Sequence, residues 1–516
     1  MQPIQKASAL QKRAGKKCEK TAALSPYETY AQSLSKTDAE ELARFFRGFD
    51  MHCRLHAAGR RQMRKDFEAA ILYYHAQNVP LDTVLKRLDT KFLGGFYARS
   101  SQLWFALDDA AKIYPISLEH GRMSLFRLAV YLRQEIVPEL LQMALHFTIK
   151  RFPSFATTLK KGFFWHYLDT AKRRFCIEAE QDIPCQPLRV SVSGSQSFRV
   201  LYYQNRISVE FFHVLTDGVG GMCFLKVLTG EYLRLLGEEI HIDESMWDIN
   251  ATPSHEEFEN AFARVQHSKQ ANGFIEKPAV QMNGRLSETK PCRVLHFKMD
   301  ANVLKQTAQS HGCTVTVYLL ALLFLAGKAA TDELRGEMSI QVPVNMRKFF
   351  SSRTVRNFAM YCGIRLPIEA DQDLAQLIDK IREQLAQKTS QECMVDMLTA
   401  TERLVNTMKF VPLAVKQPVA KLVYGFLGDK VFSNTLSNLG LVKLPPSLAQ
   451  HVLSMDFVLG TAVLNRALCG LVTVNDTSTL SITKMTIDPS FEDRLYDLLS
   501  ADGIDIKVEG STLYED

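Results

Sequence analysis

The sequence predicts an α/β protein of two lobes, each a mixed sheet flanked by helices, preceded by a helical extension. Along the chain, segments with an apolar residue at every second position alternate with segments whose apolar residues recur every three or four. These periods are typical of half-buried strands and of amphipathic helices. The chain has 516 residues, 46% of them hydrophobic, which is enough for more than one core.

Residues 1–36 are predicted to form a basic, disordered tail. Six basic residues against Glu19 give its first 26 residues a charge of +5, so the rest of the chain is nearly neutral although the total is +6. A basic tail can contact nucleic acid or anionic lipid. No basic surface interleaved with aromatic residues follows it, so we expect no nucleic-acid partner.

Residues 37–98 are predicted to be the helical extension, because Leu42 and Phe46 continue an apolar stripe at helical spacing. Within it, His52, Cys53 and His56 lie close together in sequence. Zinc sites usually need three or four close ligands, so we expect no metal site here.

The first lobe is predicted over 99–250. It should contain a strand near Leu125–Leu132, a helix with Pro138 in its first turn, and an antiparallel pair, 189–203 and 207–213, that turns at Gln204 and Asn205. A helix follows and should stop at Gly237.

A polar stretch with interspersed Pro and Gly is predicted to be a linker over 251–290. The second lobe should occupy 291–516 and begin with a strand at 293–299, a helix at 302–310 and an apolar helix after Thr314. A strand at 340–344 should end in Asn345, Met346 and Arg347. The last region, 457–487, reads as strands with a turn at Asn475 and Asp476.

One motif stands out chemically: His213, Asp217 and Gly218, between the alternating strand 207–213 and the following helix. A neutral imidazole can take a proton from an alcohol or amine and return it later, which makes His213 a candidate general base. Asp217 is expected to hold the loop by pairing with a cation, and Gly218 to supply unusual backbone freedom. The H-x-x-x-D-G pattern arises by chance in roughly one such chain in thirty, so its position after a strand adds weight.

This segment resembles the active-site motif of the chloramphenicol acetyltransferase-like superfamily of CoA-dependent acyltransferases, which includes alcohol acetyltransferases and peptide-synthetase condensation domains. Residues 104–115 also resemble the opening segment of the alcohol acetyltransferase branch. The resemblance implies two lobes with a central tunnel and His213 as catalytic base, with Asp217 and Gly218 completing the motif. Phe212 stands where many bacterial members have a second histidine.

Further roles follow from the same resemblance. Asn345 and Arg347 are similar to the N-x-R element that supplies a cation to the motif aspartate. Residues 437–440 resemble an S-N-x-G loop near the channel, so Ser437 or Asn438 is a candidate donor to the oxyanion. The basic residues near the end of the strand at 340–344 are candidates to contact the CoA phosphates: Lys348, Arg353 and Arg356. The chain departs from the plant branch, which has D-F-G-W-G near its carboxyl end, and from wax ester synthases, which often have Asn-Asp where Thr316 and Val317 stand.

The resemblance therefore implies an enzyme that moves an acyl group, acetyl or another short chain, from a CoA thioester to a small-molecule hydroxyl or amine. Acyl-CoA would be a co-substrate, and no bound cofactor or metal is expected. Two alternatives remain open, a carrier-protein-dependent condensation-like enzyme and a non-catalytic acyl- or carrier-binding protein of the same fold. A purely structural interaction protein built on the helical extension is a third.

The ten cysteines show no C-x-x-C pair, and we find no secretory signal, which together favour reduced thiols and a cytoplasmic location. No run reaches the roughly 18–20 apolar residues of a membrane-spanning helix. The sequence leaves the acceptor and the oligomeric state open.

Overall fold

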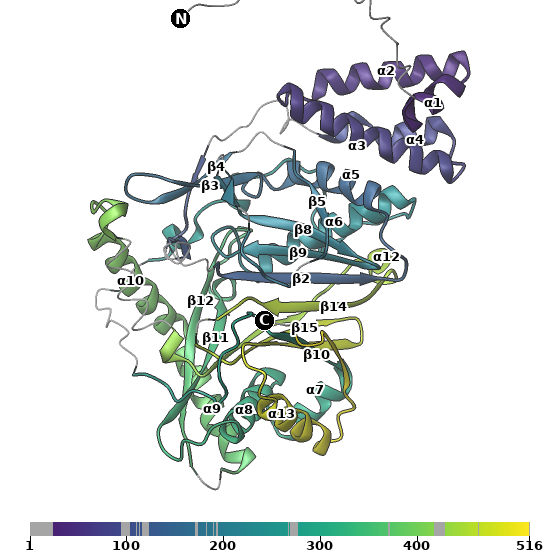
Figure 1. The fold of residues 1–516 in the computed structure, drawn as a ribbon. Coiled ribbons are helices and arrows are strands. Elements are labelled where there is room, and N and C mark those ends of the chain that lie inside the picture. The colour runs from purple at the N-terminus through teal and green to yellow at the C-terminus, as the bar shows by residue number, and fades with distance from the viewer. Residues whose placement is uncertain are drawn as a thin grey trace, which may run out of the picture.

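The structure is a computed structural model, and it confirms the predicted α/β architecture of mixed sheets flanked by helices (Figure 1). It describes residues 24–93, 104–109, 111–112, 114–115, 123–170, 174–181, 183–188, 190–191, 194–266, 268, 277–369, 372–416, 429–462 and 464–514. The six basic residues and Glu19 that give residues 1–26 their charge lie outside these ranges.

The helical extension begins earlier than predicted. Its helices are α1 (Pro26–Ser33), α2 (Lys36–His52), α3 (Ala57–Ala76) and α4 (Leu81–Arg87). The prediction of a tail to residue 36 was wrong from Pro26 onward, because Ser25 and Glu28 form a capping box that starts α1 and Tyr30 is buried against the extension. The basic run just before this helix hid the capping signal.

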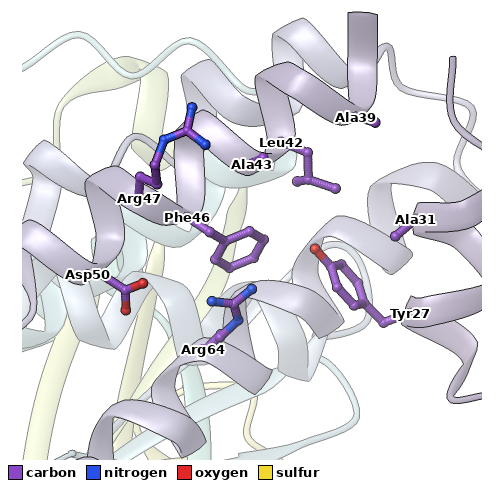
Figure 2. Close-up of a pocket in the computed structure, with 9 residues that line it drawn as sticks. All are labelled: Tyr27, Ala31, Ala39, Leu42, Ala43, Phe46, Arg47, Asp50 and Arg64. Atoms are coloured by element: carbon purple, nitrogen blue, oxygen red, sulfur yellow. The ribbon is translucent and has the colours of Figure 1, made fainter. Parts of the chain in front are cut away.

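A pocket of 380 Å³ lies between α1, α2 and α3 of the extension (Figure 2). Its floor includes Leu42 and Phe46, and the Arg64 guanidinium lies 4.2 Å from the centre of the Phe46 ring. Figure 2 shows the side chains of Arg47 and Asp50 on one side of Phe46 and that of Tyr27 on the other. None of the lining residues belongs to the His213 motif.

The extension shares a hydrophobic core with the first lobe. Phe67 of α3 makes an edge contact with Phe147 of α5 (Pro138–Thr148), with ring centres 6.3 Å apart. Next to it, the Asp66 carboxylate accepts hydrogen bonds from His146 at 2.8 Å and from Arg174 at 2.6 Å. The extension is therefore a packed part of the body.

The first lobe contains a five-stranded sheet covered by α5 and α6 (Gly218–Leu236). In order across the sheet, the strands are β14 (Val452–Leu459), β2 (Leu125–Leu132), β9 (Arg206–Phe212), β8 (Phe198–Tyr203) and β5 (Ile177–Ala179). The β8–β9 hairpin turns at Gln204 and Asn205, as expected. A smaller sheet adds β1 (Trp104–Ala106), β4 (His166–Thr170), β3 (Thr157–Lys161), β7 (Gly194–Gln196) and β6 (Val190–Ser191).

The second lobe has a seven-stranded sheet and a separate core. Its strands, in order, are β12 (Ala359–Pro367), β11 (Glu337–Asn345), β13 (Asn434–Leu441), β15 (Ala467–Val474), β16 (Thr477–Lys484), β10 (Arg293–Asp300) and β17 (Lys507–Gly510). Its helices are α7 (Ala301–Ser310), α8 (Val315–Ala329), α9 (Leu374–Lys388), α10 (Gln391–Thr407) and α13 (Ser490–Ala501). Helix α12 (Pro446–Ala449) precedes β14 and packs through Leu448 in the core of the first lobe.

Two features cross the predicted boundary between the lobes. Strand β14 comes from the carboxyl-terminal part of the chain but pairs with β2 of the first lobe, and it lies between β2 and β15 in Figure 1. The predicted linker is also packed in its described part, since Phe262 is buried and Glu257 forms a 2.6 Å ion pair with Arg151. The lobes are therefore joined by more than a flexible connection.

Within the described ranges, no single helix is long and apolar enough to cross a membrane. In the same part of the chain, α7 and α8 taken together reach the length and apolar composition of a membrane span, but their axes are bent by 80° where they meet.

Candidate active site

The His213 motif lies where β9 ends and α6 begins. His213 follows Phe212, the last residue of β9, and its backbone N–H donates to the Ser124 carbonyl at 2.9 Å. Asp217 is the N-cap of α6, and its Oδ1 accepts from the N–H groups of Val219 and Gly220 at 3.1 and 3.0 Å. The N-terminus of a helix favours a negative charge, so this carboxylate is stabilised where it stands.

The other oxygen of Asp217 reaches the second lobe. Oδ2 accepts from Arg347 Nη1 at 2.7 Å and from the backbone N–H of Phe358 at 2.8 Å. Both side chains are largely buried, with 4% of Asp217 and 11% of Arg347 exposed. Because these four hydrogen bonds occupy both carboxylate oxygens, Asp217 fixes the loop between the lobes and does not orient the imidazole.

Arg347 is itself held on several sides. Asn345 Oδ1 accepts from its backbone N–H at 3.1 Å and from Nη1 at 3.2 Å. Its Nη2 donates to the carbonyls of Thr354 and Arg356, both at 2.8 Å. The carbonyls belong to a stretch that we call the crossing segment, residues 353–358, which leads from the second lobe over the start of α6 and into β12.

The glycines of the motif make room for this crossing. The Cβ of any other residue at position 220 would lie 2.0 Å from the Val355 carbonyl oxygen, and one at Gly218 would lie 2.6 Å from the Leu439 side chain. Gly218 does not have the left-handed backbone angle that its sequence context suggested, and a Cβ there would need the Leu439 side chain of β13 to shift. The stricter requirement is at Gly220, where the close atom is a backbone oxygen.

His213 lies in an aromatic environment. Its ring stacks on Tyr114 with centres 5.3 Å apart and an angle of 19°, and it is tilted at 4.7 Å against Phe126. Nδ1 is enclosed and no described side chain is bonded to it, a backbone hydrogen bond with Thr216 acts on the ring, and part of the residue stays accessible. Burial lowers the pKa of the imidazole to about 4, although the Asp217 carboxylate opposes this shift. The ring is therefore neutral at physiological pH.

The depressed pKa predicts the pH dependence of turnover. A base works only when it is unprotonated, so kcat/KM should not lose rate to His213 protonation until the pH falls to about 4, well below the 6.5 of a free imidazole. We expect a pH–rate profile to show this low acid limb. Burial raises the pKa of Asp108 to about 7, so this carboxyl could itself produce an acid limb near neutral pH. The profile is therefore also measured in Asp108→Asn. An acid limb near pH 6.5 that persists in this variant would contradict a desolvated His213.

Arg356 does not point to solvent as a phosphate contact must. Its side chain is 4% exposed and forms a 3.0 Å ion pair with the fully buried Asp108, and it also donates to the carbonyl of Ala106. The prediction that Arg356 contacts CoA was therefore wrong. Because Arg356 lies in the crossing segment, its side chain points toward the first lobe. The Asp108 carboxylate, more than two hundred residues earlier in the chain, is its counter-charge there.

The other two candidate phosphate contacts remain accessible. Lys348 is exposed at the end of a short 3-10 turn, Met346–Lys348. The Arg353 side chain is 63% exposed and lies 3.1 Å from Glu257, so it is only partly committed. Both remain proposed contacts.

The predicted S-N-x-G loop is part of strand β13. Ser437 pairs with Gly470 of β15 and is 8% exposed, and the strand irregularity begins only after Asn438. Asn438 Nδ2 donates to Thr316 Oγ1 at 3.0 Å, while its Oδ1 accepts from the Gly440 N–H at 2.7 Å. The prediction of a loop was wrong because β15 extends the ladder through these residues. Ser437 and Asn438 remain candidate oxyanion donors, although the Asn438 Nδ2 group already donates one hydrogen bond to Thr316.

Among the described residues, no three His, Cys, Asp or Glu side chains are grouped so as to hold a metal ion. His52 Nδ1 is bonded to Thr90 Oγ1 at 2.9 Å, and Cys53 is buried against Met63.

No family model matches the sequence, and no curated protein matches it either. Solved structures do match. The chain has the fold of an acetyltransferase and of a condensation domain.

Three examples have a TM-score above 0.5. Trichothecene 15-O-acetyltransferase from Fusarium sporotrichioides has a TM-score of 0.52 at 12% identity, over 77% of this chain and 94% of that one. Polyketide synthase associated protein 5 from Mycobacterium tuberculosis gives 0.51 at 12%, over 77% and 97%. The first condensation domain of the calcium-dependent antibiotic synthetase gives 0.51 at 11%, over 78% and 95%.

Sequence reasoning assigned no role to three residues beside His213 in this acyltransferase-like fold: Tyr114, Phe126 and Asn357. Tyr114 and Asn357 lie in segments that resemble the acyltransferase superfamily, but resemblance of a whole segment does not identify the side chain that faces the His213 motif. Asn357 Nδ2 donates to the His213 carbonyl at 3.1 Å across 144 residues of sequence, and no local pattern reports such a contact.

Proposed function

We propose that the protein is an acyltransferase that moves an acyl group, acetyl or another short chain, from a CoA thioester to a hydroxyl or amine, with His213 as general base. One observation carries the proposal: a neutral, partly accessible imidazole lies at the junction of two lobes, and its motif aspartate is bonded to an arginine of the other lobe. The fold, shared with an acetyltransferase, supports this reading.

In the proposed reaction, His213 accepts the proton of the acceptor O–H or N–H as the oxygen or nitrogen attacks the thioester carbonyl. Since Nδ1 is enclosed, Nε2 is the nitrogen that accepts this proton. The attack forms a tetrahedral intermediate, whose oxyanion needs a donor such as Ser437. As the carbon–sulfur bond breaks, the imidazolium returns its proton to the CoA thiolate.

The direct test is an acyl-transfer assay with acetyl-CoA and a panel of alcohols and amines, with products identified by mass spectrometry. We expect an acetylated product and one equivalent of free CoA thiol. Binding of acetyl-CoA with no product from any acceptor class would favour the non-catalytic alternative.

The donor should be free acyl-CoA and not an acyl group on a carrier protein. Both present a thioester on the same pantetheine arm, but only CoA adds the nucleotide phosphates, for which Lys348 and Arg353 are available near the end of β11. We expect acetyl-CoA to react with a higher kcat/KM than acetyl-pantetheine, and Lys348→Ala with Arg353→Ala to raise KM for acetyl-CoA alone.

Lys380→Ala, which removes an exposed cation on α9, serves as the matched control and should leave KM unchanged. Equal kcat/KM for acetyl-CoA and acetyl-pantetheine would mean that the nucleotide is not used, and the carrier-protein alternative would replace free CoA.

A further inference from the structure

His213 lacks the side-chain partner that usually orients a catalytic imidazole. Many bases of this kind are held by a hydrogen bond to the second ring nitrogen. Here no described side chain is bonded to Nδ1, and both oxygens of Asp217 are committed elsewhere. The plane of the ring therefore depends on a backbone hydrogen bond with Thr216 and on the groups that pack against it.

The group most nearly parallel to the imidazole is the ring of Tyr114, stacked at 5.3 Å and 19°. Tyr114 reaches His213 from the segment that follows β1, and its side chain hydrogen-bonds Asn357. Burial is the main cause that raises the pKa of its hydroxyl to about 12, so Tyr114 stays neutral wherever the enzyme works.

Asn357 connects this ring to the second lobe. It is 1% exposed, its Nδ2 donates to the His213 carbonyl at 3.1 Å, and its Oδ1 accepts from the Ala359 N–H at 3.2 Å. One buried amide thus contacts both the backbone of the base and the ring stacked on it.

The residues on each side of Asn357 are bonded to the buried ion pair. The carbonyl of Arg356 accepts from Arg347 Nη2 at 2.8 Å, and the N–H of Phe358 donates to Asp217 Oδ2 at 2.8 Å. The Arg347–Asp217 pair therefore fixes the backbone that presents the Asn357 side chain.

We propose that Asn357 and Tyr114 are positioning residues for His213, and that Asn357 transmits the geometry of the Arg347–Asp217 pair to the base. The proposal rests on the proposed function for its effect on rate, but its effect on the imidazole itself does not depend on any reaction. Neither side chain takes part in proton transfer.

Tyr114→Leu, Tyr114→Phe and Asn357→Leu test this in the full chain. Tyr114→Leu removes the stacked ring and opens the imidazole to water, so the His213 pKa should rise from about 4 toward 6.5, and kcat should fall by up to about 100-fold with KM for acetyl-CoA unchanged. Asn357→Leu keeps the volume but removes the amide's hydrogen bonds to the His213 carbonyl, the Ala359 N–H and Tyr114, and should lower kcat in the same way. Tyr114→Phe keeps the ring and should leave the pKa near its wild-type value with a smaller loss of kcat.

Tyr496→Phe is the matched control, because Tyr496 lies on α13 and is 40% exposed. The His213 titration is read by NMR of isotope-labelled histidine, with His213→Ala to assign the signal. Folded Tyr114→Leu with an unchanged titration would overturn the proposal, as would a folded Asn357→Leu with wild-type kcat. If the wild-type protein transfers no acyl group, the proposed function fails, and the shift in Tyr114→Leu still decides whether Tyr114 sets the surroundings of the imidazole.

Discussion

His213→Ala is expected to abolish turnover while leaving the fold intact. A positioned general base contributes typically ~10² to 10⁴ in rate, and no other imidazole among the described residues belongs to the motif. The side chain makes ring contacts with Tyr114 and Phe126 but no hydrogen bond through Nδ1, so its removal should cost little stability. The measurements are kcat/KM for acyl transfer and the melting temperature.

His241→Ala is the matched control, because the side chain of His241 is 75% exposed on the chain that leaves α6. It should behave as wild type in both measurements. A folded His213→Ala protein with an undiminished rate would rule out His213 as the base and require another proton acceptor.

The Asp217–Arg347 pair should give the largest effect on stability. Asp217→Asn keeps the N-cap of α6 but leaves the Arg347 charge buried without its partner. Arg347→Met likewise leaves the Asp217 charge buried without its cation. Removing one member of a buried pair typically costs ~3 to 5 kcal/mol in the free energy of unfolding. The double variant should lose clearly less than the sum of the single losses, as measured by denaturant titration.

An exposed pair provides the comparison. Arg382 and Asp379 on α9 lie 2.9 Å apart with 49% and 72% of their side chains exposed, and such pairs contribute ~0 to 1 kcal/mol. Strictly additive losses for Asp217→Asn and Arg347→Met would show that the two charges do not stabilise each other in solution.

Local pattern was enough to predict the elements around the motif. The alternation before His213 marks β9, and the helical spacing up to Gly237 marks α6, because both signals come from neighbours in sequence. The contact of Arg347 with Asp217 was anticipated through a family resemblance and not from spacing.

What sequence could not predict depends on distant partners. Arg356 reads as one of several surface cations until Asp108 is placed beside it, and β14 reads as a strand without any sign of which sheet it joins. Gly220 shows the same limit, since the backbone carbonyl that excludes a Cβ there belongs to Val355, far along the chain.

The position of β14 has a consequence for how the protein is made. Leu132 of β2 pairs with Val452 of β14, so β2 must wait for a partner translated about 320 residues later. At ~5 to 20 residues per second, the ribosome needs roughly 15 to 60 s to supply it. Throughout that interval one edge of an almost wholly buried strand has no neighbour, and such an edge invites pairing with other nascent chains. The first lobe is thus synthesised first, but its sheet cannot be completed until β14 has been translated. Chaperones that shield hydrophobic edges should matter most in this interval.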